Sequence, residues 1–586
     1  MGLDIVRDSI FGNLVNLASG GKLLPFPDQR KDYEIPQQYL PRHERSPPSS
    51  PPGSRRPSDP TPAGDRDNST LVDESGVCKR EDSTDKGSDI EKGTAKAKPT
   101  LDPAAEAEPT MTGSDRPDYL VDWLENDQEN PHNWSPKKRY LVATLIAFMT
   151  TGVYIGSAIF TSGEESIMTY FGVIQVVATL GLSLFILGYG IGPMFLAPLQ
   201  DVVSIGRNPI YVGGLFLFVL FQVPVIFAPN IGTILVFRFF AGFVGSPALA
   251  TGGTSMTELF PMHVWPYAIG IWSIGAVCGP VFGPVIGGFA AQANGWRWPI
   301  YELLWVSGTA LLVLFFLLPE TNEKTILHRR AARLRKLTGN PRFMSHYEME
   351  RHEGETIFRA VRNNFVIGLK VAADPAIGFA NFYIGLVYSI FYLWFETFPI
   401  VFSEIHGFSL GVAGLPYLGF VVSAVITFTF YCWYQHAVMA PRMRNDPNFG
   451  PETRLELGLG AAFFIPISLF MFGWGAKAHW MVPIVGAALY FPGIFLLFQS
   501  ILMFVSMYAK PEYNSSVMAS NTFFRSSFAA AFPLFGSYYV KALGVGGACS
   551  LLAGVSLIMI PILYLLYRNG RRLRNKSKWA NHDADK

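Results

Sequence analysis

Long apolar runs recur between residues 139 and 567, and they limit the possible folds more than any other feature of this sequence. A helix needs about 20 apolar residues to cross the roughly 30 Å of hydrocarbon in a bilayer. Only 16% of the 586 residues are charged, against about 25% in soluble proteins. We therefore predict an all-α membrane protein with twelve transmembrane helices, at residues 139–160, 174–198, 208–228, 232–251, 264–290, 297–318, 375–402, 410–434, 458–476, 480–506, 514–540 and 546–567.

The runs form two sets of six, separated by a long basic connection. Two six-helix bundles joined by a cytoplasmic linker resemble the plan of the major facilitator transporters, whose substrate site lies between the halves near the midplane. The predicted parts are an N-terminal cytoplasmic segment, a disordered cytoplasmic tail, a first bundle, a basic linker, a second bundle and a C-terminal cytoplasmic tail, at residues 1–40, 41–115, 116–318, 319–374, 375–567 and 568–586.

Basic residues indicate the orientation. Lys and Arg cluster just before the first run, in the linker and in the C-terminal tail, whereas "TSGEESIMTYFG" after the first run has none. Short cytoplasmic loops carry an excess of Lys and Arg. We therefore expect both termini in the cytoplasm and an external loop at residues 161–172. This orientation also predicts that the four glycosylation sequons stay unmodified: Asn68, Asn133, Asn514 and Asn575.

The N-terminal segment contains "LDIVRDSIFGNLVNL", whose apolar residues fall on a rough helical stripe. Two interpretations remain open, a helix on the cytoplasmic membrane surface and a short docking segment. Residues 41–115 are rich in Pro, Ser and charged residues, a composition typical of disorder. The four cysteines are scattered and indicate neither a disulfide framework nor a zinc site.

The fifth apolar run contains "SIGAVCGPVFGPVIGG", in which glycine recurs every four residues. Such a row lies on one face of a helix and lets another helix approach closely, while each proline bends the helix. The stretch resembles the fifth-helix motif of the drug:proton antiporters of the major facilitator superfamily. A simple packing interface is the alternative. The matching residues are Gly275, Gly279, Pro280, Gly283, Pro284, Gly287 and Gly288.

Two further motifs carry the same resemblance. "APLQDVVSIGRNPIY" resembles the loop motif that latches the cytoplasmic side, with Asp201 and Arg207 as charged partners and Gly206 as the turn residue. It departs from the usual pattern in its first residue, in its spacing and at Asn208, and an ordinary solvated loop is the alternative. "ILVFRFFAGFVGSPALA" resembles the fourth-helix motif with Arg238. An arginine within a span is costly in lipid and is expected to face the interior.

Longer stretches narrow the resemblance to the fungal drug:proton antiporters, above all the multidrug pumps that confer resistance to azoles such as fluconazole and to benomyl. These stretches include "ENPHNWSPKKRY", "LLPETNEKTIL" and "ASNTFFRSSFAAAFPLFG". The resemblance implies a multi-pass plasma-membrane efflux pump that exports varied hydrophobic compounds. Inward proton flow would supply the energy, so no cofactor is expected. We also expect a monomer with no nucleic-acid partner.

An exporter of apolar compounds needs an aromatic cavity with few polar anchors. Candidate lining residues lie in the seventh, tenth and eleventh runs: Tyr388, Phe391, Tyr392, Phe395, Phe498, Gln499, Asn521, Phe524 and Arg525. Taken singly, each aromatic residue also fits an ordinary core or lipid-facing position. Glu396 and Glu302 are the candidate proton carriers, with Arg238 or Arg525 tuning the acid. Either glutamate also fits a span end with no transport role.

The same features bear on other possible functions. Nutrient uptake by the same fold is disfavoured by the Gly-Pro motif, whereas export of a self-made toxin or pigment remains open. The sequence has no zincin, nucleophile-elbow or Walker pattern and no repeated filter loop, so hydrolysis, ATP-driven pumping and a channel lack support. We therefore expect a transporter and not an enzyme.

Overall fold

The computed structural model describes residues 2–30, 33–41, 118–350, 357–446, 449–510 and 513–582. One compact unit comprises Met1–Glu34 and Val121–Lys586, and it holds every element discussed below except Leu120, the first residue of β1. Most of the second unit, Ile35–Leu120, lies outside the described residues. The disorder expected for residues 41–115 therefore falls there too, as does the sequon at Asn68.

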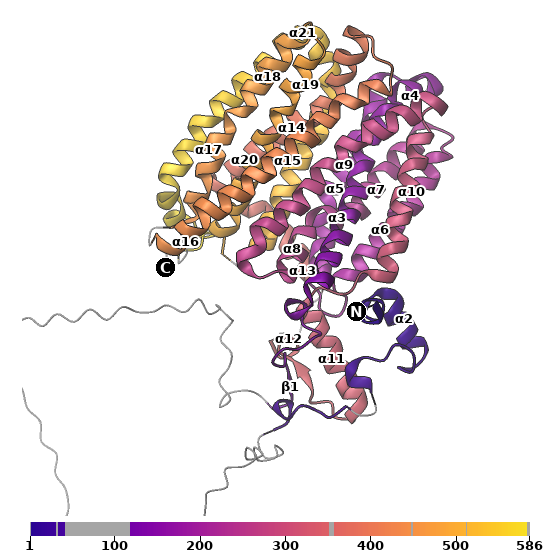
Figure 1. Ribbon diagram of the computed structural model, residues 1–586, viewed down its shortest axis with the longest axis vertical. Coiled ribbons are helices and arrows are strands. Elements are labelled where there is room, and N and C mark those ends of the chain that lie inside the picture. The colour runs from indigo at the N-terminus through magenta and orange to yellow at the C-terminus, as the bar shows by residue number, and fades with distance from the viewer. Residues whose placement is uncertain are drawn as a thin grey trace, which may run out of the picture. The chain divides into compact units, whose positions relative to one another are not determined.

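The first half of the membrane unit consists of long helices that pack side by side (Figure 1). Polar residues between the spans cap the helices. Asn230 is an example, because its side chain accepts a hydrogen bond from the Thr233 N–H and caps the start of α7. The helices of this half are α3 (Pro136–Ala158), α4 (Glu164–Phe171), α5 (Gln175–Gln200), α6 (Arg207–Ile226), α7 (Ile231–Ala250), α8 (Gly252–Leu259), α9 (Trp265–Asn294) and α10 (Trp298–Leu317).

The second half has the same character (Figure 1). Asp374 caps its first helix by accepting from the backbone N–H groups of Ala376 and Ile377. A π-helical turn, Pro399–Ile405, extends that helix. The helices are α14 (Pro375–Phe398), α15 (Leu418–Tyr434), α16 (Ala440–Asn445), α17 (Leu455–Ala462), α18 (Phe464–Gly475), α19 (Met481–Ala488), α20 (Tyr490–Tyr508) and α21 (Asn514–Lys576).

Eleven helical stretches among the described residues are long and apolar enough to cross a membrane, and the last is Ser516–Lys576 with 61 residues. At 1.5 Å per residue that stretch would be about 90 Å long if straight, roughly three bilayer cores. Its backbone leaves helical geometry at Gly544 (φ 70°). The chain beyond its end returns to the residues before its start, since Lys510 N–H donates to the Trp579 carbonyl and Asn581 N–H to the Tyr508 carbonyl. The stretch therefore folds back on itself, and the eleven stretches accommodate the twelve predicted spans.

One expectation about a loop is wrong. Residues 161–172 were predicted as an external loop, but Ile159–Gly163 form a 3-10 turn and Glu164–Phe171 form α4. Gly172 ends α4 in the left-handed region, with φ 65°. A glycine with positive φ is a common helix stop. The segment thus continues the first span into the protein, and it buries Glu164.

Shorter elements lie outside the spans, at the end of the unit that carries both termini (Figure 1). The N-terminal segment docks there on the first half: Lys138 Nζ lies 3.0 Å from an Asp8 carboxylate oxygen, and the Phe11 ring packs on Phe315 and Phe316. Leu14 and Leu17 stay exposed. These elements are α1 (Gly2–Asp8), α2 (Ile10–Ala18), α11 (Glu323–Thr338), α12 (His346–Glu350), α13 (Ile357–Val371), β1 (Leu120–Val121) and β2 (Met344–Ser345).

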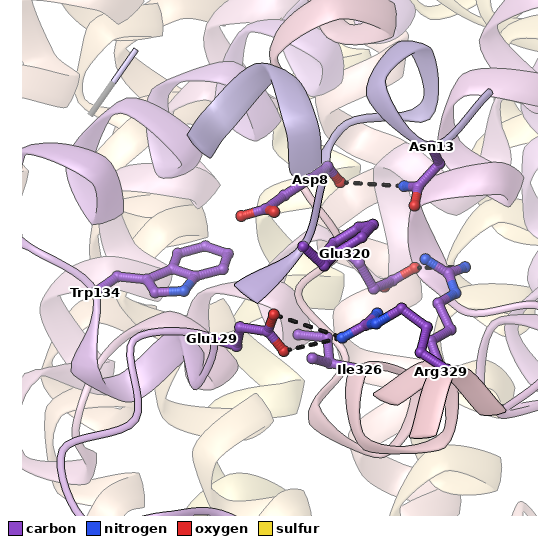
Figure 2. Close-up of a pocket in the computed structure, with 9 residues that line it drawn as sticks. Asp8, Asn13, Glu129, Trp134, Glu320, Ile326 and Arg329 are labelled. Atoms are coloured by element: carbon purple, nitrogen blue, oxygen red, sulfur yellow. Dashed lines mark hydrogen bonds and ion pairs between the residues drawn. The ribbon is translucent and has the colours of Figure 1, made fainter. Parts of the chain in front are cut away.

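A charged pocket lies between this docked segment and the linker helix α11, and both contribute residues to its lining (Figure 2). Its acids and bases are mutually paired: Arg333 contacts Glu129 at 3.2 Å and Asp28 at 2.7 Å, and Arg329 contacts Glu320 at 3.5 Å. The cavity has a volume of about 40 Å³, which is enough for about three waters. These ion pairs therefore hold α11 against the N-terminal segment, and the pocket is too small for a drug-sized compound.

Candidate functional site

A cluster of tyrosines joins the two halves in the centre of the helical unit. The Tyr189 hydroxyl on α5 donates to the Tyr392 hydroxyl on α14 at 3.0 Å and lies 3.1 Å from the Tyr388 hydroxyl. The Tyr392 hydroxyl donates in turn to Ser157 Oγ on α3 at 3.2 Å. Tyr154 on α3 packs its ring on Tyr189. Four phenols and a serine thus form one polar network between spans one, two and seven.

Arg525 of α21 adds a permanent positive charge to this tyrosine cluster. Its guanidinium lies 4.4 Å from the Tyr388 ring centroid and 5.4 Å from that of Phe498, within the range of cation–π contact. It also forms a side-chain hydrogen bond with Tyr154. Arg525 is buried, and its Nε has no hydrogen-bond partner. Arginine keeps its proton in proteins, so the centre of the molecule is electropositive.

Only some of the other residues predicted to line a cavity lie beside the tyrosine cluster or between the halves. Phe391 and Phe395 are buried beside the tyrosine cluster, and Phe395 stacks on Tyr417 with ring centroids 5.4 Å apart. Gln499 donates to Ser273 Oγ at 2.9 Å and so links the halves. Asn521 instead donates to Asn381 within the second half. Phe524 packs on Phe523, and the structure gives it no ring contact with the cluster.

The halves also touch at both ends of the molecule. At the end that carries the termini, α13 packs against α5 and α21, and the Phe365 ring lies 5.9 Å from that of Phe195. At the other end, the Gly411 N–H donates to Gln292 at 2.8 Å and the Ser537 hydroxyl donates to Gln175 at 3.2 Å. The halves therefore contact each other at both ends as well as through the buried tyrosine cluster between them.

Arg238 lies fully buried in α7. Its Nε donates to the Gly181 carbonyl at 3.1 Å and its Nη2 to the Ser157 carbonyl at 3.4 Å, while Nη1 has no partner. Phe160 and Phe185 face the guanidinium with centroids 4.7 and 4.5 Å away. The arginine therefore faces the protein interior and has no lipid contact. Ser157 connects it to the tyrosine cluster.

Two buried carboxylates accompany Arg238, and the sequence identified only one of them. Glu396 of α14 is 5% exposed and forms a side-chain hydrogen bond with Gln175. Glu164 of α4 is 8% exposed and accepts a hydrogen bond from Thr179 Oγ1 at 3.1 Å. Glu164 interacts electrostatically with both Glu396 and Arg238.

Glu164 was missed because its segment was interpreted as a loop. The Gly172 stop signal was the feature of the sequence that could have revealed the helix. Glu302, the second predicted carrier, lies half-buried in α10 and stays a prediction.

The glycine row of α9 faces α3 of the same half. A Cβ on Gly279 would lie 2.7 Å from the Tyr154 Cβ, and one on Gly283 would lie 2.7 Å from the Ile159 backbone nitrogen. Gly275 also faces α3, and Gly287 faces the 3-10 turn Ile159–Gly163 that follows it. The opposite face of α9 meets the second half, where a Cβ on Gly414 would lie 2.5 Å from the Pro284 carbonyl oxygen. Close packing therefore occurs on both faces, with the glycine row inside the first half and Pro284 at the boundary between halves.

The predicted latch at the start of α6 uses a different main partner. Arg207 Nη2 lies 2.8 Å from a Glu258 carboxylate oxygen and only 4.0 Å from Asp201, whose side chain is mostly exposed. Glu320 accepts the Arg207 backbone N–H at 3.0 Å. Gly206 has φ 81°, and a Cβ there would lie 2.4 Å from the Glu320 carboxylate. The latch thus braces the ends of spans three, four and six within the first half, and the motif alone did not indicate Glu258 or Glu320.

These features agree with the comparison against known families. The model described as Major Facilitator Superfamily matches residues 141–533. The chain belongs to the major facilitator superfamily. The predicted all-α major facilitator fold is therefore confirmed, and the twelve predicted spans fit the eleven apolar helical stretches among the described residues. The solved structure of the proton:xylose symporter XylE shares this fold, with a TM-score of 0.50 at 13% identity over 74% of this chain and 97% of that one.

Similar members of the superfamily come from yeasts. The cycloheximide resistance protein of Candida maltosa is 36% identical over 98% of this chain and 99% of its own length. Fluconazole resistance protein 1 of Saccharomyces cerevisiae is 38% identical over 79% of this chain and 85% of its own. The sequence resemblance to fungal resistance pumps is thus confirmed.

Proposed function

We propose that this protein exports hydrophobic compounds, such as azole and benzimidazole fungicides, across the plasma membrane in exchange for protons. The tyrosine cluster with Arg525 carries the proposal. It is an aromatic centre with few polar anchors, formed by both halves of a major facilitator protein. The names of the yeast relatives, which refer to fluconazole and cycloheximide resistance, support this class of cargo.

Orientation and energy source belong to the same proposal. Both termini and the basic helix α11 gather at one end of the membrane unit (Figure 1), and positive residues favour the cytoplasmic side. Glu396, in the last turn of α14, and Arg238 supply buried charge, and buried charges within membrane spans commonly mark proton pathways. The protein would then act as a monomer, with the proton gradient as its only energy source and no bound cofactor.

Accumulation of a fluorescent hydrophobic dye tests direction, cargo and energy source together. The host should be a yeast that lacks its own efflux pumps, with and without this protein. We expect lower dye content in cells that express it, and loss of the difference when a protonophore is added. Equal dye content in both strains, or export that persists with the protonophore, would contradict the proposal. Growth on fluconazole and benomyl then defines the cargo.

A further inference from the structure

We propose that Glu164 and Glu396 form one proton-binding site that is shared between the two halves of the transporter. This inference rests on the proposed function and deepens it, because it assigns the coupling proton to a pair of residues. Glu164 belongs to α4 in the first half, and Glu396 belongs to α14 in the second. α4 lies at the end of the membrane unit away from both termini (Figure 1), and Glu396 lies in the last turn of α14.

The burial and bonding of the pair support a built site. Glu164 Oε2 accepts a hydrogen bond from Thr179 Oγ1 at 3.1 Å, and Glu396 forms a side-chain hydrogen bond with Gln175, one turn earlier on α5. The other oxygen of each, Oε1, is buried without a hydrogen-bond partner. Arg238 Nη1 is likewise buried and unpartnered. Three charged groups, each more than nine-tenths buried, thus have unused hydrogen-bonding atoms in the same region.

Charge balance favours one bound proton. Two carboxylates and one guanidinium leave one net negative charge in a site that excludes water, and two like charges that are close together cannot both be buried cheaply. One proton converts one carboxylate to a carboxylic acid and leaves the site neutral, with no other bond made or broken. The new O–H can then donate to the other carboxylate. Tyr417, a further titratable group among the described residues, also interacts with Glu396.

The location of the pair explains how protonation would couple to transport. When the halves separate at this end, both acids meet the outside solution and bind a proton. When this end closes, the two acids are buried together, and the bound proton makes this possible because it removes the repulsion between two carboxylates. Proton loss toward the cytoplasm restores the repulsion and favours opening again. Arg238 and Tyr392 both bond to Ser157, so the acid pair and the tyrosine cluster are connected through one residue.

Reconstituted vesicles test the pair with Glu164→Gln, Glu396→Gln and the double variant. Two readouts are needed, export of the dye driven by an imposed pH difference and exchange of labelled dye at equal pH. We expect each single variant to keep exchange and to lose driven export by at least tenfold, and the double variant to resemble the singles. Glu165→Gln is the matched control, because Glu165 is the exposed neighbour, and it should behave as wild type.

The possible outcomes distinguish failure of the shared proton site from failure of the proposed function. Wild-type vesicles that move no dye under a pH difference would refute the proposed function itself. Driven export by Glu164→Gln at the wild-type rate would overturn the pair and leave Glu396 alone as the carrier. Loss of exchange together with driven export, in a variant of normal abundance, would assign Glu164 a structural role and would also overturn the pair.

Discussion

Gly283 of α9 lies so close to α3 that a Cβ on it would stand 2.7 Å from the backbone nitrogen of Ile159 and 3.0 Å from the Ala158 carbonyl carbon. Backbone atoms cannot move aside as the end of a flexible side chain can. The contact explains why this apolar helix contains so many glycines. Any side chain at residue 283 would force the two helices apart.

We therefore expect Gly283→Ala to destabilise the first half by about 1–3 kcal/mol, the usual cost of overpacking. Transport should fall more than abundance, because α9 also contacts the second half through Pro284. Thermal unfolding of the purified protein and resistance of the host together measure both effects. Gly308→Ala is the control, since a Cβ on that glycine would meet nothing within 4 Å. Equal behaviour of the two variants would show that the close contact is unimportant.

The spans were predictable because their signal is local. Bilayer thickness sets the length of an apolar run, and each run can be read without knowing what the helix packs against. The break between the last two runs also followed from the sequence, since the predicted gap at residues 541–545 contains Gly544, where the structure leaves helical geometry.

The site was less predictable because its contacts are distant in the sequence. Glu164 and Glu396 are more than 200 residues apart, and neither position by itself indicates the other. Arg207 pairs with Glu258, whereas the motif directed attention to Asp201, which lies closer along the chain. A motif describes the local backbone. The partner of a charged side chain depends on how the helices pack.

Glu258→Gln should weaken the latch at the start of α6. Arg207 would lose the carboxylate at 2.8 Å and keep a buried charge with poorer compensation, at a cost of about 3 kcal/mol. We expect a lower unfolding temperature and reduced export. Asp201→Asn is the comparison, because Asp201 is exposed and 4.0 Å away, and exposed pairs contribute roughly 0–1 kcal/mol. A larger loss in Asp201→Asn than in Glu258→Gln would contradict this ranking.

Arg525 should make the transporter discriminate against permanently cationic cargo. Its guanidinium faces Tyr388 at 4.4 Å in the centre of the molecule, and a cationic compound there would meet a like charge in a water-poor site. Arg525→Gln should therefore raise export of a cationic dye relative to neutral fluconazole by roughly tenfold. Ser527→Ala, which removes only a hydrogen bond to its own helix, should leave the ratio unchanged. An unaltered ratio in Arg525→Gln would place the cargo elsewhere.

The ion pairs that α11 forms with neighbouring acidic residues should make the stability of the protein depend on pH. Arg330 Nη2 donates to Asp127 at 3.0 Å. Burial acts to raise the pKa of Asp127, but the hydrogen bonds and charge of Arg330 outweigh it, so the pKa lies below its ordinary value of 3.8. A carboxyl group with a lowered pKa in the folded state stabilises the protein above its unfolded pKa, and this stabilisation is lost as the pH falls through the folded value.

Asp127→Asn should accordingly lower the unfolding temperature at pH 7 by roughly 2–4 °C, and the difference in unfolding temperature from wild type should narrow as the pH falls below about 4.

Glu348→Gln provides a second case. Burial raises the pKa of Glu348 less than the hydrogen bonds from Arg335 and the Ser345 N–H lower it, so its difference from wild type should narrow over the same range. Unfolding curves of the purified protein between pH 7 and pH 3 measure both variants. A difference that stays constant with pH would show that Asp127 acts through packing and not through its charge.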